Sequence, residues 1–266
     1  MNKKRTVKTL QKMKKHGEKI TALTAYDSLF AGYLEESEID VILVGDSVGM
    51  VYAGQETTIP VTIEEIIYHT KAVKRSVKNA LLVADMPFMS YQVNPEETLK
   101  NAGRILKESG AESVKMEGGE NISNSVSRCV KAGIPVMGHL GLTPQSIHQF
   151  GSYKVQGKSK DASEKLIKDA LILQKAGCYA IVLEKIPAML AKEITEKLDI
   201  PTIGIGAGKY TDGQILVTYD MLGMFEKFKP KFARRYSELA TEIKKSITKY
   251  VNDVRNNSFP SKDESY

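Results

Sequence analysis

Tryptophan is absent from the 266 residues, and cysteine occurs only twice, at Cys129 and Cys178. One cysteine falls in a helical pattern and the other just before an apolar run, so both are expected to be small buried side chains rather than a disulfide or a metal pair. No apolar run approaches the roughly 18 residues of a membrane-spanning helix, and residues 1–19 are basic, without the apolar core of a signal peptide. These absences argue against a disulfide scaffold and a membrane protein, and they predict a cytoplasmic location.

Negative charge is the scarcer sign, with 32 acidic residues against 38 Lys and Arg and a formal net charge of +6. The basic residues cluster in residues 3–15 and 227–235. Such clusters can attract nucleic acid or a small anion, but they are more often solvated faces. No zinc-finger, RRM or basic-zipper pattern accompanies them. We therefore expect small-molecule substrates, with neither nucleic acid nor a membrane as partner.

Short apolar runs that end in a polar residue recur along the chain, most clearly in residues 41–46, 80–85 and 180–184. Runs that are apolar at every position are typical of parallel strands covered on both faces. Five further segments resemble them: 20–27, 113–118, 135–141, 201–206 and 215–220. Together these segments predict eight strands.

Helical patterns with recognisable ends lie between most of these runs. Thr62 precedes Glu65 by the spacing of a capping box, Asn94 and Pro95 offer a cap followed by proline, and Asp161 is placed as a further cap. Glycines stand where helices close in a left-handed residue, at Gly110, Gly133 and Gly177.

The alternation of strand and helix about eight times favours a closed (β/α)₈ barrel, with an open doubly wound sheet as the alternative. The length fits one domain over residues 1–266. After the eighth strand, helical spacing predicts a helix over 231–251, and a polar tail is expected from about residue 252.

Acidic and other polar residues follow the predicted strands. They are Asp27, Asp46, Asp85, Glu117, His139 and Glu184, with Lys115 inside the fourth strand. Because the C-terminal ends of barrel strands meet at one face, most of these side chains are expected at one mouth. Carboxylates packed so closely repel one another unless cations neutralise them. The alternative for each acid is that it caps the following helix, and for His139 that it is a core histidine bonded to backbone.

Magnesium is the metal that this set of residues predicts, because it prefers oxygen ligands and takes one or two carboxylates while keeping several waters. Asp46 and Asp85 are the best candidates for direct ligands. The single strand-end histidine and the absence of paired cysteines argue against zinc. The other three histidines, His16, His69 and His148, are expected on the surface or in loops.

A glycine-rich stretch over residues 204–209 lacks both the Walker spacing and the dinucleotide fingerprint. Loops after the seventh and eighth strands of a barrel often bind phosphate, but tight backbone turns explain these glycines equally well.

The sequence resembles the ketopantoate hydroxymethyltransferase family over nearly its whole length. The segments that carry the resemblance are Thr24-Ala-Tyr-Asp27, Val44-Gly-Asp-Ser-Val-Gly49, Ala84-Asp-Met-Pro-Phe88, Val114-Lys-Met-Glu-Gly-Gly119, Met137-Gly-His-Leu-Gly-Leu-Thr-Pro-Gln145, Gly204-Ile-Gly-Ala-Gly208 and Thr211-Asp-Gly-Gln-Ile-Leu-Val217. Their order and joint presence make the resemblance specific. The chain departs from the family at its end, where Asp263 and Glu264 replace the usual Glu and His and put any role of that tail in doubt.

The resemblance implies a TIM barrel of the phosphoenolpyruvate/pyruvate-binding type, a Mg²⁺ ion and a homodecamer. It implies transfer of a hydroxymethyl group from 5,10-methylenetetrahydrofolate to 3-methyl-2-oxobutanoate through a Mg-stabilised enolate, giving 2-dehydropantoate for pantothenate biosynthesis. By the same resemblance, Asp46, Asp85 and Glu117 surround the metal.

Further roles are carried over from the family to matching positions. Glu184 is expected to accept the proton, and the substrate is expected to contact Asp46, Ser47, Asp85, Lys115 and His139. A related Mg-dependent 2-oxo acid aldolase or lyase is the alternative within enzymes. Lyases of the isocitrate type use a reactive loop cysteine, and neither cysteine here follows a predicted strand. A non-catalytic binder of anions or nucleic acid is the alternative outside enzymes.

Overall fold

The computed structural model describes residues 3–226 and 230–266. It divides the chain into two compact units, Met1–Leu216 and Val217–Tyr266. The expectation of a single domain is not tested by this division and stays a prediction.

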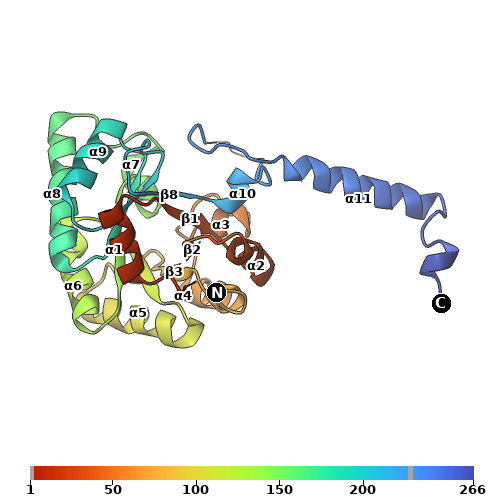
Figure 1. The fold of residues 1–266 in the computed structure, drawn as a ribbon, viewed down its shortest axis with the longest axis horizontal. Coiled ribbons are helices and arrows are strands. Elements are labelled where there is room, and N and C mark those ends of the chain that lie inside the picture. Colours follow the sequence, from red (N-terminus) through yellow and green to blue (C-terminus); the bar gives the residue numbers. More distant parts are fainter. Residues whose placement is uncertain (1–2, 227–229) are drawn as a thin grey trace. The chain divides into compact units, whose positions relative to one another are not determined.

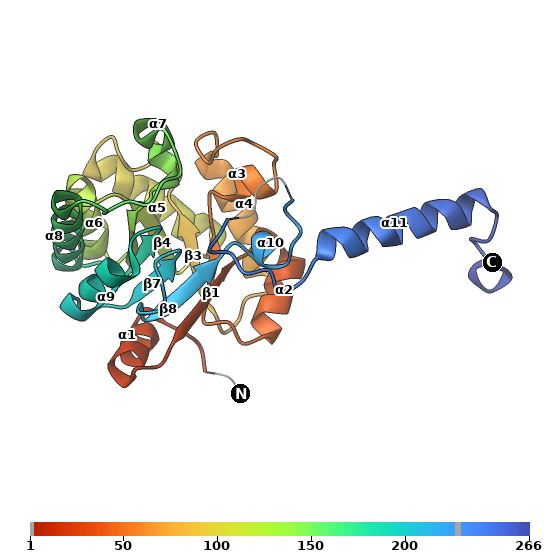
Figure 2. The ribbon, with the colours of Figure 1, turned by 90° about the horizontal axis from the view of Figure 1, so that it is seen from above.

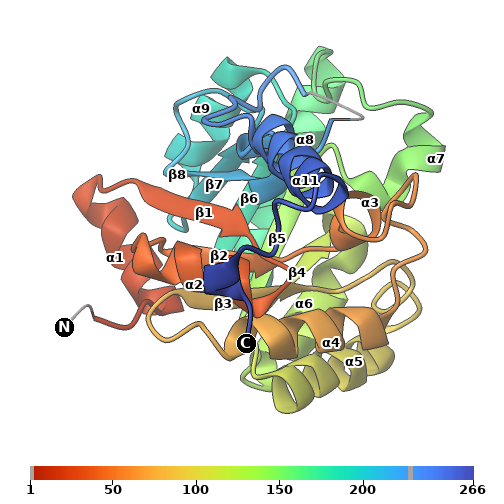
Figure 3. The ribbon, with the colours of Figure 1, turned by 90° about the vertical axis from the view of Figure 1, so that its right-hand side faces the viewer.

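The first unit is built around a closed parallel barrel, whose strands are labelled in Figure 3. In the described part of the chain eight strands close in sequence order: β1 (Ile20–Thr24), β2 (Val41–Val44), β3 (Leu81–Asp85), β4 (Ser113–Glu117), β5 (Val136–Gly141), β6 (Ala180–Glu184), β7 (Thr202–Ile205) and β8 (Gly213–Leu216). Pairing of β1 with β8 completes the ring. The predicted barrel is confirmed, and the open sheet was the wrong alternative.

Helices cover the outside of this barrel (Figures 1 and 2). The helices of the first unit are α1 (Val7–His16), α2 (Ser28–Glu36), α3 (Val48–Val51), α4 (Ile63–Lys74), α5 (Pro95–Ser109), α6 (Ser123–Lys131), α7 (Ile147–Phe150), α8 (Lys160–Ala176) and α9 (Ala188–Lys197), with short 3₁₀ turns η1 (Glu120–Ile122) and η2 (Pro144–Ser146). Strands β2 to β5 are buried at every position, because each is enclosed by the barrel interior and these helices.

Most of the predicted helix ends are confirmed. Thr62 and Glu65 form a capping box, and Asn94 accepts a hydrogen bond from the backbone N–H of Glu97. The exception is Asp161, because the Ser159 side chain caps α8 instead, accepting from the N–H of Ala162 at 3.3 Å.

The eighth strand was predicted over 215–220, which is wrong at both ends. Gly213 already pairs with Ile20 and Ile203 on the two neighbouring strands. A Cβ at this position would lie 2.5 Å from the carbonyl oxygen of Ile20, so only glycine allows that approach. The apolar pattern could not reveal this pairing, because the strand begins with a residue that has no side chain.

Helix α1 packs against the barrel interior at the end where the strands begin. Its buried Leu10 and Met13 share one apolar cluster with strand residues such as Ile20, Val41 and Met137. Burial of each such side chain contributes about 1.5–3 kcal/mol. This helix therefore belongs to the core of the barrel.

Basic residues of the N-terminal cluster tie this segment to the barrel. Arg5 Nε lies 2.8 Å from Asp40 Oδ1, and Lys14 Nζ lies 2.8 Å from Asp212 Oδ2. The same two aspartates accept backbone N–H groups, from Thr21 and Thr202 respectively. Part of the N-terminal charge cluster therefore has a structural role.

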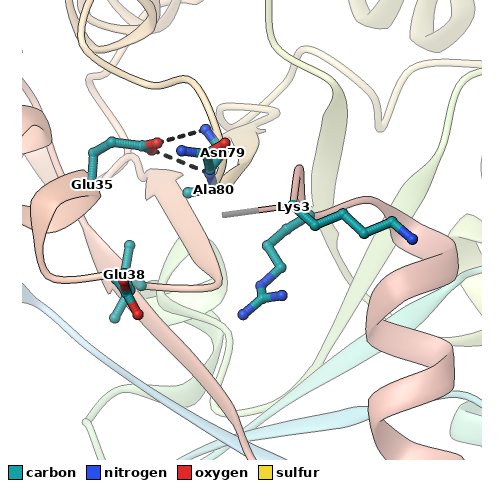
Figure 4. A pocket seen from close by; sticks show the side chains of 7 residues that line it. Lys3, Glu35, Glu38, Asn79 and Ala80 are labelled. Atoms are coloured by element: carbon teal, nitrogen blue, oxygen red, sulfur yellow. Dashed lines mark hydrogen bonds between the residues drawn. The ribbon is translucent and has the colours of Figure 1, made fainter. Parts of the chain in front are cut away.

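A small pocket lies beside this segment, lined by Lys3, Arg5, Glu35, Glu38, Ile39, Asn79 and Ala80 (Figure 4). In it, the Glu35 carboxylate accepts the backbone N–H groups of Asn79 at 2.6 Å and Ala80 at 3.2 Å. Although burial raises the pKa of Glu35, these donors hold it below its ordinary value. Glu35 thus joins the end of α2 to the start of β3.

The second unit contains α10 (Thr218–Met221), α11 (Leu239–Arg255) and η3 (Lys262–Glu264). Helix α11 begins later than the predicted residue 231 and runs past 251. Its apolar residues at helical spacing are exposed: Ile243, Ile247, Tyr250 and Val254. Residues 227–229 of the second basic cluster lie outside the described residues.

Both cysteines are free and buried, as expected. Cys129 lies in α6 and Cys178 just before β6. In residues 3–226 and 230–266, no helix combines the length and the apolar character that crossing a membrane requires.

Replacing Leu10 by Ala is expected to lower the free energy of unfolding by about 2–5 kcal/mol, because it leaves a cavity in the barrel core. Urea unfolding followed by circular dichroism measures the change. The exposed Lys12 of the same helix provides a control, since Lys12→Ala should leave the midpoint unchanged. Equal midpoints for both variants would contradict the core position of α1.

The two thiols are expected to be unreactive in the native protein at pH 8. Burial raises the pKa of Cys129 to about 11 and that of Cys178 to about 12, and only the thiolate is nucleophilic. Titration with a chromogenic disulfide should detect neither thiol before unfolding and both in denaturant. Rapid reaction of either thiol in the native protein would show that this cysteine is accessible to solvent.

Candidate active site

The strand ends gather charged side chains at one mouth of the barrel. Asp85, Glu117 and Glu184 are the last residues of β3, β4 and β6, Asp46 follows β2, and His139 lies in β5. All except Glu184 are buried, with exposed fractions of 2–6%. The convergence expected from a barrel is therefore present.

Lys115 of β4 is the ammonium group at the centre of this cluster. Its Nζ lies 2.9 Å from Asp85 Oδ1, 3.9 Å from Glu117 Oε1 and 3.2 Å from His139 Nδ1. Although burial lowers the pKa of Lys115, Asp85 and Glu117 raise it above its ordinary value. Lys115 is charged at neutral pH and neutralises part of the carboxylate charge.

His139 connects two of the carboxylates. Its Nδ1 lies 3.4 Å from Glu117 Oε1, and its Nε2 lies 3.2 Å from Glu184 Oε2. Burial and the neighbouring Lys115 lower the pKa of His139, but the two glutamates outweigh them and raise it to about 9. The imidazole therefore carries a positive charge at neutral pH between Glu117 and Glu184.

The two aspartates are held together by the backbone. Asp85 Oδ2 accepts the N–H of Asp46 at 2.9 Å. Gly45 makes this approach possible, since a Cβ there would lie 3.3 Å from Asp85 Oδ2 and 2.9 Å from Ser47 Oγ. Burial, together with the neighbouring carboxylates, raises the pKa of Asp46 well above its ordinary value, and burial also raises the pKa of Asp85.

The charges of this cluster fit a divalent cation. Among the described residues at the mouth, four carboxylates face two cationic groups, Lys115 and His139, so two negative charges are left uncompensated when all four carboxylates are ionised. The described ranges contain no group of three or more His, Cys, Asp or Glu side chains already spaced as metal ligands. Magnesium needs only one or two carboxylates and completes its octahedron with water. Asp46 and Asp85 fit that requirement.

Other predicted residues fall beside the cluster or away from it. Ser47 Oγ lies 2.9 Å from the hydroxyl of Tyr26, next to Asp46. Asp27 instead caps α2 by accepting the N–H of Phe30. His69 is buried and its Nδ1 lies 2.7 Å from the carbonyl oxygen of Tyr26, so its expected surface position was wrong. The sequence around His69 predicts only a helix, and it does not predict a contact with the distant backbone of Tyr26.

The glycine-rich stretch forms backbone turns after β7. Gly206 and Gly208 have positive φ angles of 63° and 79°, which glycine adopts without strain. The tight-turn explanation therefore suffices for these two positions.

Sequence reasoning missed Tyr91 and Gln145, which are both buried at the mouth. The Tyr91 hydroxyl accepts the N–H of Glu117 at 3.1 Å and lies 2.8 Å from Gln145 Oε1. Gln145 Nε2 donates to Asp46 Oδ2 at 2.8 Å. Gln145 is the last residue of the Met137–Gln145 segment that carries the family resemblance. Because its amide is neutral, the search for charged residues after the strands did not select it.

Comparison with known proteins gives a family over nearly the whole chain. A model of the family described as "Ketopantoate hydroxymethyltransferase" matches residues 4–262. The 3-methyl-2-oxobutanoate hydroxymethyltransferase of Syntrophus aciditrophicus (strain SB) is 52% identical over 261 residues, which cover 98% of this chain and 96% of that protein.

Solved structures share the fold at low sequence identity. A phosphonopyruvate hydrolase in complex with oxalate and Mg²⁺ has a TM-score of 0.62 and 12% identity, with 98% of this chain and 93% of that chain covered. A 2,3-dimethylmalate lyase, described as a member of the PEP mutase/isocitrate lyase superfamily, has a TM-score of 0.59 and 12% identity, with coverage of 97% and 90%. These likenesses show that the (β/α)₈ barrel fold is shared.

Replacing Lys115 by Met is expected to lower the free energy of unfolding by about 3–5 kcal/mol, because buried carboxylates lose their partner. Thermal unfolding with and without Mg²⁺ measures the effect, and Mg²⁺ should recover part of the loss by binding the folded state. The control is Lys160→Met, which removes a pair whose side chains are 86% and 64% exposed and should leave the midpoint unchanged. A Lys115→Met protein as stable as the wild type would refute the charge balance described here.

Proposed function

Because this chain belongs to the ketopantoate hydroxymethyltransferase family, we propose that it transfers a hydroxymethyl group from 5,10-methylenetetrahydrofolate to 3-methyl-2-oxobutanoate. The products are 2-dehydropantoate and tetrahydrofolate, with water supplying the hydroxyl oxygen. The observation that carries the proposal is the buried cluster of carboxylates around Lys115 at the barrel mouth. The product would serve pantothenate biosynthesis.

The substrate is a small anion with a carboxylate and a 2-oxo oxygen. Asp46 and Asp85 would hold Mg²⁺, with Glu117 beside them, and Ser47 and Lys115 would bind the substrate. When bound, Mg²⁺ would supply a Lewis acid that stabilises the enolate as its charge develops. Lys115 adds a fixed positive charge in the same buried site, where Coulomb interactions are stronger than in water.

Glu184 is the proposed general base, which takes the proton from C3 of the substrate. It is less enclosed than the other carboxylates, with 14% of its side chain exposed, and it belongs to β6, apart from the Asp46 and Asp85 pair. His139 Nε2 lies 3.2 Å from Glu184 Oε2, so the protonated imidazole forms an ion pair with this carboxylate. Over the whole transfer, the carbanion carbon forms a bond to the methylene carbon of the donor, and both bonds from that carbon to nitrogen break. Water supplies the hydroxyl group on the same carbon, and tetrahydrofolate leaves with a proton on each nitrogen.

A homodecamer is implied by the family resemblance alone, and a cytoplasmic location is the expectation from the sequence. Both stay predictions. Light scattering after size-exclusion chromatography measures the first.

Product formation from 3-methyl-2-oxobutanoate and 5,10-methylenetetrahydrofolate is expected to depend on Mg²⁺. A chelator should abolish it, and added Mg²⁺ should restore it. Mass spectrometry identifies 2-dehydropantoate. Turnover that needs the metal but no folate would instead indicate a related aldolase or lyase.

Replacing Glu184 by Gln is expected to slow exchange of the substrate C3 proton in deuterated water by about 10²–10⁴-fold, the usual contribution of a positioned base. NMR of 3-methyl-2-oxobutanoate with enzyme and Mg²⁺ measures the rate. Substrate binding should persist, and Glu193→Gln, at a half-exposed residue of α9, should exchange at the wild-type rate. Undiminished exchange in Glu184→Gln would assign the base to another residue.

A further inference from the structure

We propose that Gln145 is a positioning residue, which holds Asp46 and Glu117 in the orientation that a bound divalent cation requires. The residue follows β5 in η2, and its exposed fraction is only 4%. This inference rests on the proposed metal site and adds to it the group that sets the geometry of its carboxylates.

The orientation of the Gln145 amide is fixed by its surroundings. The Nε2 group donates to Asp46 Oδ2 at 2.8 Å and to the carbonyl oxygen of Met86 at 2.9 Å. Oε1 accepts from Tyr91 at 2.8 Å and from Gln92 Nε2 at 3.2 Å. A flipped amide would turn its oxygen towards two acceptors, so the N–H groups must face Asp46.

The backbone of the same residue holds a second carboxylate. The Gln145 N–H donates to Glu117 Oε2 at 3.0 Å. Tyr91 reinforces this contact because its hydroxyl accepts the Glu117 N–H while lying within hydrogen-bond distance of Gln145 Oε1. One residue after β5 therefore links the ends of β2, β3 and β4.

These contacts are those expected of a residue that hydrogen-bonds to the metal ligands without binding the ion itself. A buried carboxylate has several rotamers and four lone-pair directions, and only some of them point at a common ion. A neutral amide fixes Asp46 without changing the net charge that attracts the cation. A second ammonium at this position would cancel one of the two uncompensated negative charges. Hydrogen-bonded partners of metal ligands typically contribute 10–100-fold to metal affinity or activity.

The test compares two glutamine-to-methionine variants of the full chain. Gln145→Met keeps the length of the side chain and the backbone N–H to Glu117, but loses both bonds of Nε2. Gln92→Met, the control, removes a donor to Oε1 from an exposed residue and leaves the Asp46 contact intact. Electron paramagnetic resonance of Mn²⁺ measures the dissociation constant without any turnover, and thermal unfolding in chelator shows whether each variant is folded.

Gln145→Met is expected to raise the Mn²⁺ dissociation constant roughly 10–100-fold, while Gln92→Met keeps the wild-type value. Should the methionine variant not fold, Gln145→Asn retains an amide that is one methylene too short to reach Asp46, and the same loss is expected. Wild-type affinity in the folded Gln145 variant, or an equal loss in both positions, overturns the inference. If the wild-type protein does not bind Mn²⁺, the proposed metal site is wrong, and so is the inference about Gln145.

Discussion

Neutralisation of buried carboxylates is the constraint on which the rest of the mouth depends. Parallel strands that close into a ring direct their last residues to one end, so Asp85, Glu117 and Glu184 cannot avoid one another. In such a buried place, leaving a charge without a partner costs several kcal/mol. Lys115 and His139 neutralise part of this negative charge, and the negative charge that remains attracts a cation.

Stability and chemistry occupy opposite ends of the same barrel. At the end where strands begin, α1 packs Leu10 and Met13 into an apolar cluster that contains no catalytic candidate. At the other end, raised pKa values for Asp46 and Asp85 show that their ionised forms are destabilised by burial. The apolar packing offsets that cost, which is how a barrel can carry a strained charge cluster on a rigid frame.

Much of the fold could be predicted from the sequence, because β2, β3 and β6 are continuous apolar runs and an acidic residue stands at or just after the end of each. The positions of Asp46, Asp85, Glu117, His139 and Glu184 followed from that pattern. The rest depends on contacts between segments far apart in the chain. The start of β8 depends on glycine facing Ile20, Ser159 displaces Asp161 as a cap, and Gln145 acts through hydrogen bonds that leave no periodic signal.

The closure of the ring has a consequence for how the chain is made. Strand β1 pairs with β8, which begins at Gly213, almost 200 residues later in the chain. Lys14 likewise donates to Asp212 and to the carbonyl oxygen of Thr195. On the ribosome these N-terminal residues emerge long before their partners exist. Non-local pairing of this kind slows folding, since the intervening loop must be ordered first. A nascent chain that stops short of residue 213 exposes an open sheet edge and is a natural client for chaperones.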